Sequence, residues 1–142
     1  MRWLLGLLLM LIPPGGWCAA QAQITSDTLP KRVVSQAYNA FNRHEPLGFL
    51  SFFAPVWYHS VLEDPAAAPR RQVRDENIRD FLALKSFATK PTITVIRRMV
   101  IGPYVIDEQV RGPDRSRRLD IFEVRQGKIV REWESGPLPT TP

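Results

Sequence analysis

An aspartate within an apolar strand, Asp120, is the first residue of this sequence that could do chemistry. A strand over residues 118–124 puts Asp120, Phe122 and Val124 on one face, because successive side chains of a strand point to opposite faces. A carboxyl group on an apolar face is costly unless it is hydrogen-bonded, paired or used. Two interpretations stay open: a pocket acid that handles a proton, or a carboxylate paired with one of the chain's many arginines.

The hairpin that follows decides which side chains accompany Asp120. A three-residue loop over 125–127, with its glycine left-handed, pairs Asp120 with Glu132 and points Glu132 and Glu134 to the same side, while Trp133 faces outward. A two-residue loop pairs Asp120 with Trp133 and turns both glutamates away. We favour the three-residue loop, because Gln-Gly is a poor primed turn. Two nearby carboxyls in a dry pocket raise one pKa, which is the condition for a general acid near neutral pH.

Histidine offers a second route to acid–base chemistry. His59 lies in the middle of a predicted strand and could serve as a base, although its shared parity with Trp57 favours a place in the wall or core. Metal binding is not expected, since the best ligand set is a weak group of His59, Glu63 and Asp64. The sequence has neither a phosphate-binding glycine loop nor a serine or cysteine nucleophile motif. We therefore expect no cofactor, and either cofactor-free chemistry or plain binding.

The first 22 residues are typical of a cleavable signal peptide. Arg2 precedes an almost unbroken apolar run of ten residues, 3–12, and Pro13-Pro14-Gly15-Gly16 then ends any helix. Ala20-Gln21-Ala22 predicts cleavage after Ala22. The alternative, a retained anchor, suits the run less well, because a membrane helix needs about 20 apolar residues. We expect a secreted or periplasmic protein in which residues 23–142 form the domain.

The domain that remains is small and mildly basic. Removing 22 of the 142 residues leaves 120, takes Arg2 and the single cysteine, Cys18, with the leader, and lowers the formal net charge from +5 to about +4. One domain of this size buries enough surface to fold alone. The scattered arginines do not form a nucleic-acid footprint, so we expect neither a nucleic-acid partner nor a membrane after leader removal.

Periodicity predicts three helices and a late run of strands. Apolar spacings of three and four predict a helix from Thr28, and Pro46 begins a shorter helix that ends before Pro55. A strand over 57–63 and a helix from Asp75 follow. Four more strands are predicted at 92–101, 104–111, 118–124 and 128–134. This order predicts an α+β fold with the helices packed on one face of a curved, mostly antiparallel sheet.

The order and three local stretches resemble the nuclear transport factor 2-like (NTF2-like) superfamily, and within it the SnoaL-like and ketosteroid-isomerase-like branch. The stretches that carry the resemblance are the helix at 33–45, the helix at 77–82 and the terminal hairpin at 119–134. The resemblance implies a cystatin-like cone with a pocket between the sheet and three N-terminal helices. It implies no single activity, since one fold hosts many functions.

The resemblance also assigns expected roles to individual residues. Asp120 matches the protonated acid that donates to an oxyanion in ketosteroid isomerases, where an apolar site keeps that acid neutral. Asp64, in Glu63-Asp64-Pro65, resembles the family's general base only if about three residues are inserted before it. The family's tyrosine position falls on Ala37, and Tyr38 is turned by roughly 100° from it, toward the core. The catalytic candidates are thus Asp120, Asp64, His59 and Glu132, and the residues expected against the ligand are Tyr38, Trp57, Tyr58, Tyr104 and Phe122.

Two functions are therefore expected to compete. The first is a pocket that binds a small apolar molecule, with isomerase, cyclase or dehydratase chemistry left open. The second is a non-catalytic module that forms a homodimer through the outer sheet face, which the favoured register lines with Leu119, Ile121, Ile129 and Trp133. A basic stretch at Arg70, Arg71, Arg74 and Arg79 is either solvated surface or a rim for an anionic ligand.

Overall fold

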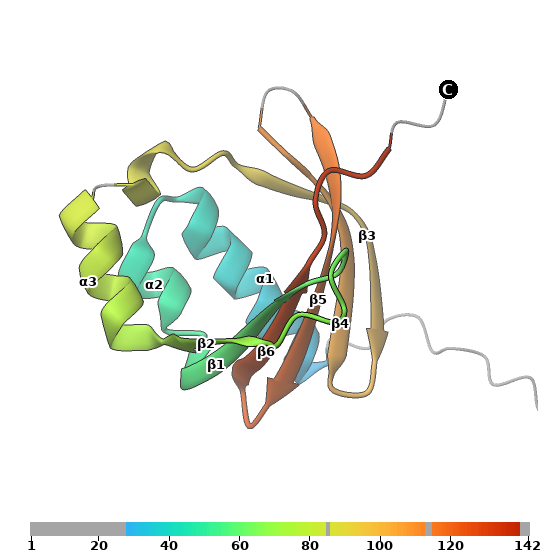
Figure 1. The fold of residues 1–142 in the computed structure, drawn as a ribbon, viewed down its shortest axis with the longest axis horizontal. Helices are drawn as coiled ribbons and strands as arrows, with labels where there is room; N and C mark the ends of the chain where they lie inside the picture. Colours follow the sequence, from blue (N-terminus) through green and yellow to red (C-terminus); the bar gives the residue numbers. More distant parts are fainter. Residues whose placement is uncertain (1–27, 85, 113–114, 140–142) are drawn as a thin grey trace, which may run out of the picture.

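The computed structural model describes residues 28–139 except 85, 113 and 114, and the expected elements are present in the expected order (Figure 1). The predicted leader, its cleavage site and Cys18 lie outside the described residues. The elements are α1 (Leu29–Asn42), α2 (Pro46–Leu50), β1 (Phe53–Val61), β2 (Arg70–Val73), α3 (Arg74–Leu84), a 3-10 helix (Ser86–Thr89), β3 (Ile93–Ile101), β4 (Tyr104–Arg111), β5 (Ser116–Arg125) and β6 (Lys128–Glu134). Within the described ranges, no helix is long and apolar enough to cross a membrane.

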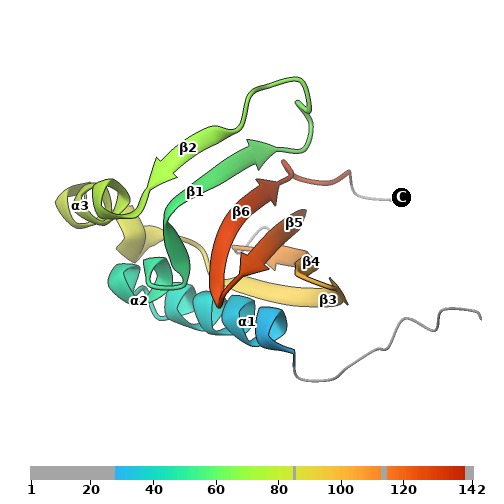
Figure 2. The same cartoon turned by 90° about the horizontal axis from the view of Figure 1, so that it is seen from below.

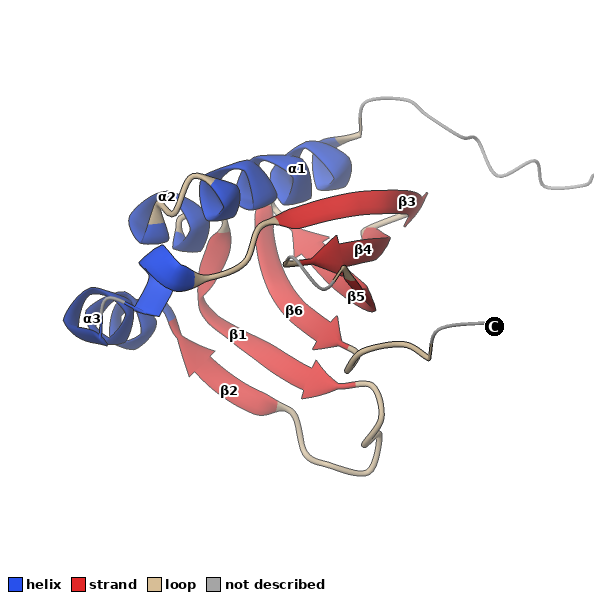
Figure 3. Cartoon of the chain, turned by 90° about the horizontal axis from the view of Figure 1, so that it is seen from above, coloured by secondary structure: helices blue, strands red, loops and turns tan. Residues whose placement is uncertain are grey.

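A single six-stranded sheet carries the fold, in the order β2-β1-β6-β5-β4-β3. β1 and β6 run parallel, and every other neighbouring pair is antiparallel. The sheet is curved, and the helices lie on its inner side, with α1 running along the sheet and α3 beside β2 (Figures 2 and 3). The predicted α+β architecture, with helices on one face of a mostly antiparallel sheet, is confirmed.

The strand β2 is the strand that the sequence did not predict. It pairs antiparallel with β1, from Val56 opposite Val73 to His59 opposite Arg70. Its sequence, Arg-Arg-Gln-Val, lacks the apolar alternation that predicts a strand, and a charged edge strand is a common way to prevent further pairing. The basic stretch therefore begins in the sheet rather than in a loop.

An aromatic core fills the space between α1, α2 and the sheet. Phe41 packs edge-on against Phe49 and Phe87, with ring centroids 5.3 and 5.2 Å apart, and Phe53 packs against Trp57 at 4.8 Å. The end of α1 is tied to the start of β3, because the Asn42 side chain both donates to the Ile93 carbonyl at 2.8 Å and accepts from its amide at 2.7 Å. These contacts fix α1 over the inner face of the sheet.

The hairpin between β5 and β6 combines a two-residue turn with a bulge. Arg125 pairs with Lys128, so the turn is Gln126-Gly127, and both turn residues have positive φ, 49° and 73°. The predicted three-residue loop is therefore wrong. The primed turn forms despite its glutamine, because Gly127 takes a left-handed conformation without steric cost.

Because of the bulge, the side chains of β6 beyond it still point to the faces of the sheet that the three-residue loop predicted. After Val124 pairs with Ile129 the register shifts by one residue, so that Phe122 pairs with Glu132 and Asp120 with Glu134. The two glutamates consequently share the inner face with Asp120, as expected, although the partner of Asp120 is Glu134 and not Glu132.

Because of the same bulge, one residue predicted on the outer face of the sheet lies on the inner face. Ile129 turns inward and is completely buried in the core, so its predicted place on the outer apolar patch is wrong. Leu119, Ile121 and Trp133 keep the outward parity and stay partly exposed. Trp133 packs on Tyr104 across that face, with ring centroids 6.5 Å apart.

Candidate functional site

A cavity of about 800 Å³ lies between the inner face of the sheet and the helices. One part of its lining is aromatic and aliphatic, and the other is polar and charged. The apolar lining includes Phe41, Phe49, Leu50, Phe53, Trp57, Phe81, Phe87, Ile93 and Phe122. The polar lining includes Tyr38, His59, Arg70, Gln72, Asn77, Lys90, Arg111, Ser116, Arg118, Asp120, Glu132 and Glu134.

The strand register arranges this lining from apolar to charged. Along β5, the inward side chains change from Val124 and Phe122 to Asp120 and then Arg118, toward the turn that joins β4 to β5. β6 changes in the same direction, from Ile129 to Glu132 and Glu134. Both strands therefore place their charged groups at the same end of the cavity, and their apolar groups toward the β5–β6 turn.

Asp120 is fully buried and is held by three donors on one oxygen. The Tyr38 hydroxyl donates to Oδ2 at 3.2 Å, the Arg111 guanidinium donates to it at 2.8 Å, and the Gln109 amide donates as well. The other oxygen, Oδ1, is buried without a hydrogen-bond partner. Burial is the main cause that raises the Asp120 pKa; Arg111 lowers it and nearby Glu134 raises it, and together these causes bring it to about 6.

Arg111 extends this cluster to a second carboxylate. Its guanidinium bonds Glu134 Oε1 at 2.5 Å as well as Asp120, while Arg118 approaches the same Glu134 oxygen at 3.4 Å. His59 Nε2 lies 3.5 Å from Glu134 Oε2. The interaction with His59 is the main cause that lowers the Glu134 pKa to about 2, and the same interaction raises the His59 pKa. Glu134 is therefore a fixed anion, and His59 is biased toward its protonated form.

Glu132 is the carboxyl of the cavity that has no partner. Among the described residues, no hydrogen bond or ion pair joins its side chain to another group. Burial and, after it, the charge of Asp120 raise the Glu132 pKa, while His59, opposite it in the β1–β6 register, lowers it, and together these causes bring it to about 7. A carboxyl with this pKa exists in both protonation states near neutral pH, which suits proton transfer.

The cavity brings together most of the residues proposed from the sequence. Asp120, His59 and Glu132 line it, as do Tyr38, Trp57 and Phe122. Tyr38 is a core residue, as expected from its position in the helix, but its hydroxyl also reaches Asp120. Burial raises the pKa of Tyr38 well above its usual value, so the phenol stays neutral and donates. The catalytic and binding roles of these residues stay predictions.

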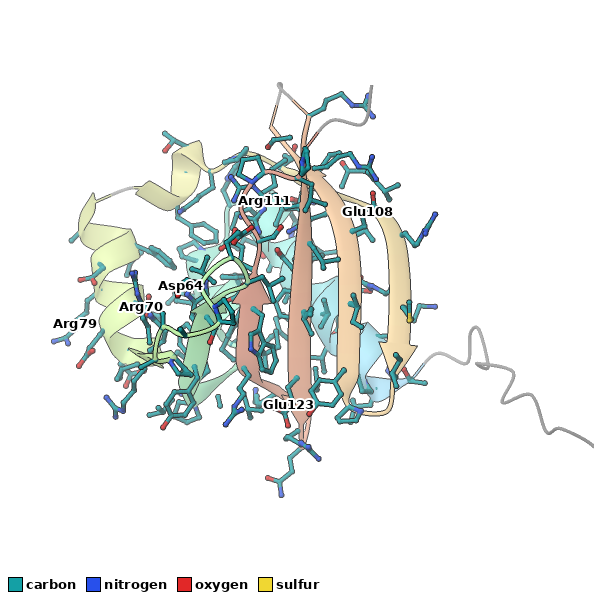
Figure 4. The ribbon with its side chains drawn as sticks, turned by 45° about the vertical axis from the view of Figure 1, so that its right-hand side comes forward. Asp64, Arg70, Arg79, Glu108, Arg111 and Glu123 are labelled. Carbon is teal, nitrogen blue, oxygen red and sulfur yellow. The ribbon has the colours of Figure 1, made fainter. Side chains whose placement is uncertain are left out.

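Three expected residues do not line the cavity. Asp64 is exposed in the turn after β1, in the loop that leads to β2 (Figure 4), because β1 ends three residues earlier, at Val61. Tyr58 is 41% exposed with Arg131 over its ring, and Tyr104 is 36% exposed beside Trp133. Their strand parity points both tyrosines to the outer face, so the expectation that these three residues face a ligand in this cavity is wrong.

The residues that sequence reasoning missed are the polar partners from β4. Gln109 and Arg111 share the inward parity of buried Asp107, and both bond Asp120. The sequence leaves open whether an arginine pairs with Asp120, and in the structure Arg111 does so. The sequence does contain a signal for this: Asp107, Gln109 and Arg111 occupy every second position of β4, which places the three side chains on the same face. In Figure 4, Arg111 lies at the end of the strands that leads into the β4–β5 turn.

The site offers no arrangement for a metal ion. Within the part of the chain that the structure describes, no group of three or more histidine, cysteine, aspartate or glutamate side chains could hold one. The carboxylates that do cluster, Asp120 and Glu134, are already occupied by Arg111.

Comparisons with known proteins find similarity in structure but not in sequence families. No protein-family model matches the sequence, and a comparison with curated proteins finds no match. A SnoaL-like protein of unknown function from Burkholderia thailandensis matches with a TM-score of 0.58 and 13% identity, over 77% of this chain and 94% of that one. A protein with a ketosteroid isomerase-like fold from Catenulispora acidiphila, solved with trimethylamine, matches with a TM-score of 0.57 and 17% identity, over 75% and 85%.

A third solved structure agrees with these two. An NTF2-like protein of unknown function from Cytophaga hutchinsonii matches with a TM-score of 0.58 and 9% identity, over 78% of this chain and 92% of that one. At such identities the likeness establishes the fold and nothing about activity.

Proposed function

This chain has the NTF2-like fold of the SnoaL-like and ketosteroid isomerase-like proteins, and we propose that its cavity binds a small, largely apolar molecule. We further propose that side chains of the cavity remove a proton from one atom of that molecule and return it to the same or another atom. The proposed reaction is proton transfer at a carbon next to a carbonyl group, as in an isomerisation, cyclisation or dehydration. A cavity of about 800 Å³ with a largely aromatic apolar part gives such a molecule room and contact area.

The observation that carries this proposal is Glu132. It is a carboxyl without a hydrogen bond or ion pair among the described residues, it lines an aromatic cavity, and its pKa is raised to about 7. A structural carboxylate in such a place is normally paired, as Asp120 and Glu134 are. A free carboxyl with a near-neutral pKa is what a general base needs at physiological pH.

The neighbouring groups supply the rest of the proposed step. Ionised Glu132 takes the proton from the carbon, the C–H electron pair forms a carbon–carbon double bond, and the carbonyl π pair moves to oxygen to give an enolate. His59, biased toward its imidazolium form by Glu134, stabilises the negative oxygen. Glu132 then returns the proton to the same carbon or to another one.

Asp120 has a supporting role in this scheme. Its Oδ2 accepts from Tyr38, Gln109 and Arg111, so at neutral pH it is an ionised acceptor rather than a donor. Its charge helps to raise the Glu132 pKa. This assignment departs from the ketosteroid isomerase analogy, in which the residue matched by Asp120 is the oxyanion donor and the one matched by Asp64 is the base.

The experiment that tests this function uses 2-tetralone, an aromatic ketone with acidic α-protons, in D₂O. The protein should accelerate deuterium incorporation at C1, followed by NMR, and Glu132→Gln should slow the protein-catalysed rate by about 100-fold. Asp64→Asn is the matched control, since it removes an exposed carboxylate that does not line the cavity, and it should leave the rate unchanged. Exchange no faster than in buffer, or equal loss in both variants, would contradict the proposal.

A second candidate function is self-association through the outer sheet face. The register places Met99, Ile106, Ile121 and Trp133 in one row across four strands, and Tyr104 packs beside Trp133. Charged side chains of both signs border the row, including Arg131 and Glu123, so a second copy of the chain offers complementary charges. Sedimentation should reveal a dimer that Trp133→Ala converts to monomer, while Met99→Gln at the row's edge should have a smaller effect. A monomer at high concentration would exclude this candidate.

We also propose export, on the sequence of the first 22 residues alone. Expression in a bacterium should give a protein that is recovered from the periplasm or the medium and whose mass corresponds to a chain that begins at Gln23. An intact N-terminus on the recovered protein would refute this.

A further inference from the structure

The charged end of the cavity holds more positive side chains than its carboxylates use. Arg111 pairs with both Asp120 and Glu134, and Arg118 also contacts Glu134. Arg70 and Lys90 line the same cavity, yet no ion pair or hydrogen bond joins either side chain to another described residue. Two cations at this cavity are therefore free to meet a ligand.

The surrounding charges do not cancel these two cations. The two negative charges of Asp120 and Glu134 are balanced by the two positive charges of Arg111 and Arg118, and the raised pKa of Glu132 leaves that carboxyl partly protonated at neutral pH. Arg70 stands opposite His59 in the β1–β2 pairing, and its charge lowers the His59 pKa. The excess positive charge thus lies next to the proposed proton-transfer group.

The remaining acids limit the kind of anion that fits. Three carboxyl groups, those of Asp120, Glu132 and Glu134, lie on the same wall and would repel a dianion such as a phosphate monoester. A carboxylate carries one charge and matches the planar fork of an arginine. The aromatic lining at the other end of the cavity, with Phe53, Trp57 and Phe122, suits a flat apolar body.

We propose that the ligand of this cavity is a flat, apolar monocarboxylate whose body lies among the aromatic side chains and whose carboxylate meets Arg70 and Lys90. The proposal deepens the function above, since it places the ligand in the same cavity. It also narrows the hypothesis of a basic rim: of the four arginines of that stretch, Arg70 alone lines the cavity. Arg79 lies on the far side of α3 (Figure 4).

The test compares 2-naphthoate with its neutral isostere, 2-naphthamide, by titration calorimetry at low ionic strength. The carboxylate should bind about 10-fold more tightly than the amide. In the double variant Arg70→Gln/Lys90→Gln, the affinity for 2-naphthoate should fall about 10-fold, to that of 2-naphthamide, while the affinity for the amide should stay the same. Arg79→Gln, which removes an exposed arginine outside the cavity, should change neither affinity.

Three results would overturn the proposal: equal affinities of the wild-type protein for the two probes, equal losses for both probes in the double variant, or no binding of 2-naphthoate at millimolar concentration. Circular dichroism of the double variant checks that it is folded, which is expected because both side chains are exposed. The proposed catalysis is judged separately. Glu132→Gln should slow the exchange on 2-tetralone by about 100-fold without removing the preference for 2-naphthoate. If the wild-type protein catalyses the exchange but shows no preference for 2-naphthoate, only the present proposal is refuted.

Discussion

The Tyr38 hydroxyl donates to Oδ2 of Asp120 across 3.2 Å, joining α1 to β5 over 82 residues of sequence. Both groups are buried, and Tyr38 also packs edge-on against Phe122 at 5.7 Å. This contact places a polar bond at the boundary between the aromatic and the charged parts of the cavity. The pKa of Asp120 therefore also depends on a residue of α1, which the sequence of the β5–β6 hairpin alone does not reveal.

Replacement of Tyr38 by phenylalanine should therefore change the titration of Asp120. The lost hydrogen bond stabilises the ionised carboxylate, so the Asp120 pKa should rise above its value of about 6. The free energy of unfolding should fall by roughly 1 kcal/mol, because Arg111 and Gln109 still satisfy the oxygen. Carbon-detected NMR measures the pKa, and urea denaturation measures the stability. Tyr58→Phe, on the outer face, should alter neither, and an unchanged Asp120 pKa in Tyr38→Phe would contradict the argument.

The stability of the protein should decrease as the pH rises from 5 to 8. Asp120, Glu132 and His59 all have folded-state pKa values above their ordinary ones, so each binds its proton more tightly in the folded protein than in the unfolded chain. The stability that they contribute is complete at low pH and is lost as the pH rises through about 6 and about 7. Glu134, with its pKa lowered to about 2, acts oppositely, but only below about pH 4.5. Urea denaturation at pH 5 and pH 8 measures the difference.

Glu132→Gln is the control for this pH dependence. A neutral amide cannot titrate, so the fall in unfolding free energy between pH 5 and 8 should become smaller in this variant. Glu63→Gln, which replaces an exposed glutamate outside the cavity, should keep the wild-type slope. A wild-type protein that gains stability between pH 5 and 8 would show that the buried carboxyls are better compensated than their contacts indicate.

The sequence predicted most of the fold, because the apolar periodicity is strong where elements face the core. In α1, for example, Val33, Val34, Ala37, Tyr38 and Phe41 recur at helical spacing, and all are buried. The strand parity of Asp120 and Phe122 was equally clear. The edge strand β2 was missed, because an edge strand of charged residues has no buried face to mark it.

The site was predicted less completely, because its partners are set by register and not by local pattern. The bulge between β5 and β6 leaves no composition signal, yet it turns Ile129 inward and Glu134 toward Asp120. The position of Asp64 depended on where β1 ends, which is the least predictable property of a strand. Arg111 lies on a different strand, and only the pairing of Asp107 with Asp120 brings it beside the carboxylate.

The turn that closes this hairpin can be improved by substitution. Gln126 adopts a φ of 49°, which asparagine tolerates better than glutamine, and Asn-Gly is the preferred pair for a type I′ turn. Gln126→Asn should raise the free energy of unfolding by about 0.5 kcal/mol, whereas Gly127→Ala, at a φ of 73°, should lower it by about 1 kcal/mol. Thermal unfolding at pH 5 compares the two variants. If both are neutral, the turn is not the two-residue turn described above.

Arg111→Met should be the most destabilising of the substitutions considered for the charged cluster. Arg111 holds both Asp120 and Glu134, so its removal leaves the buried Asp120 without its charged partner and the half-buried Glu134 with one partner fewer. Breaking a buried ion pair from one side typically costs about 3–5 kcal/mol. The loss should be smaller at pH 5 than at pH 8, since Asp120 then takes up a proton, whereas Glu134 keeps His59 and Arg118 as partners. Arg117→Met is the matched control: Arg117 pairs with Glu108 on the exposed face, and such surface pairs contribute less than about 1 kcal/mol. Equal, pH-independent losses in the two variants would mean that Arg111 acts through packing alone and that Asp120 does not depend on its charge.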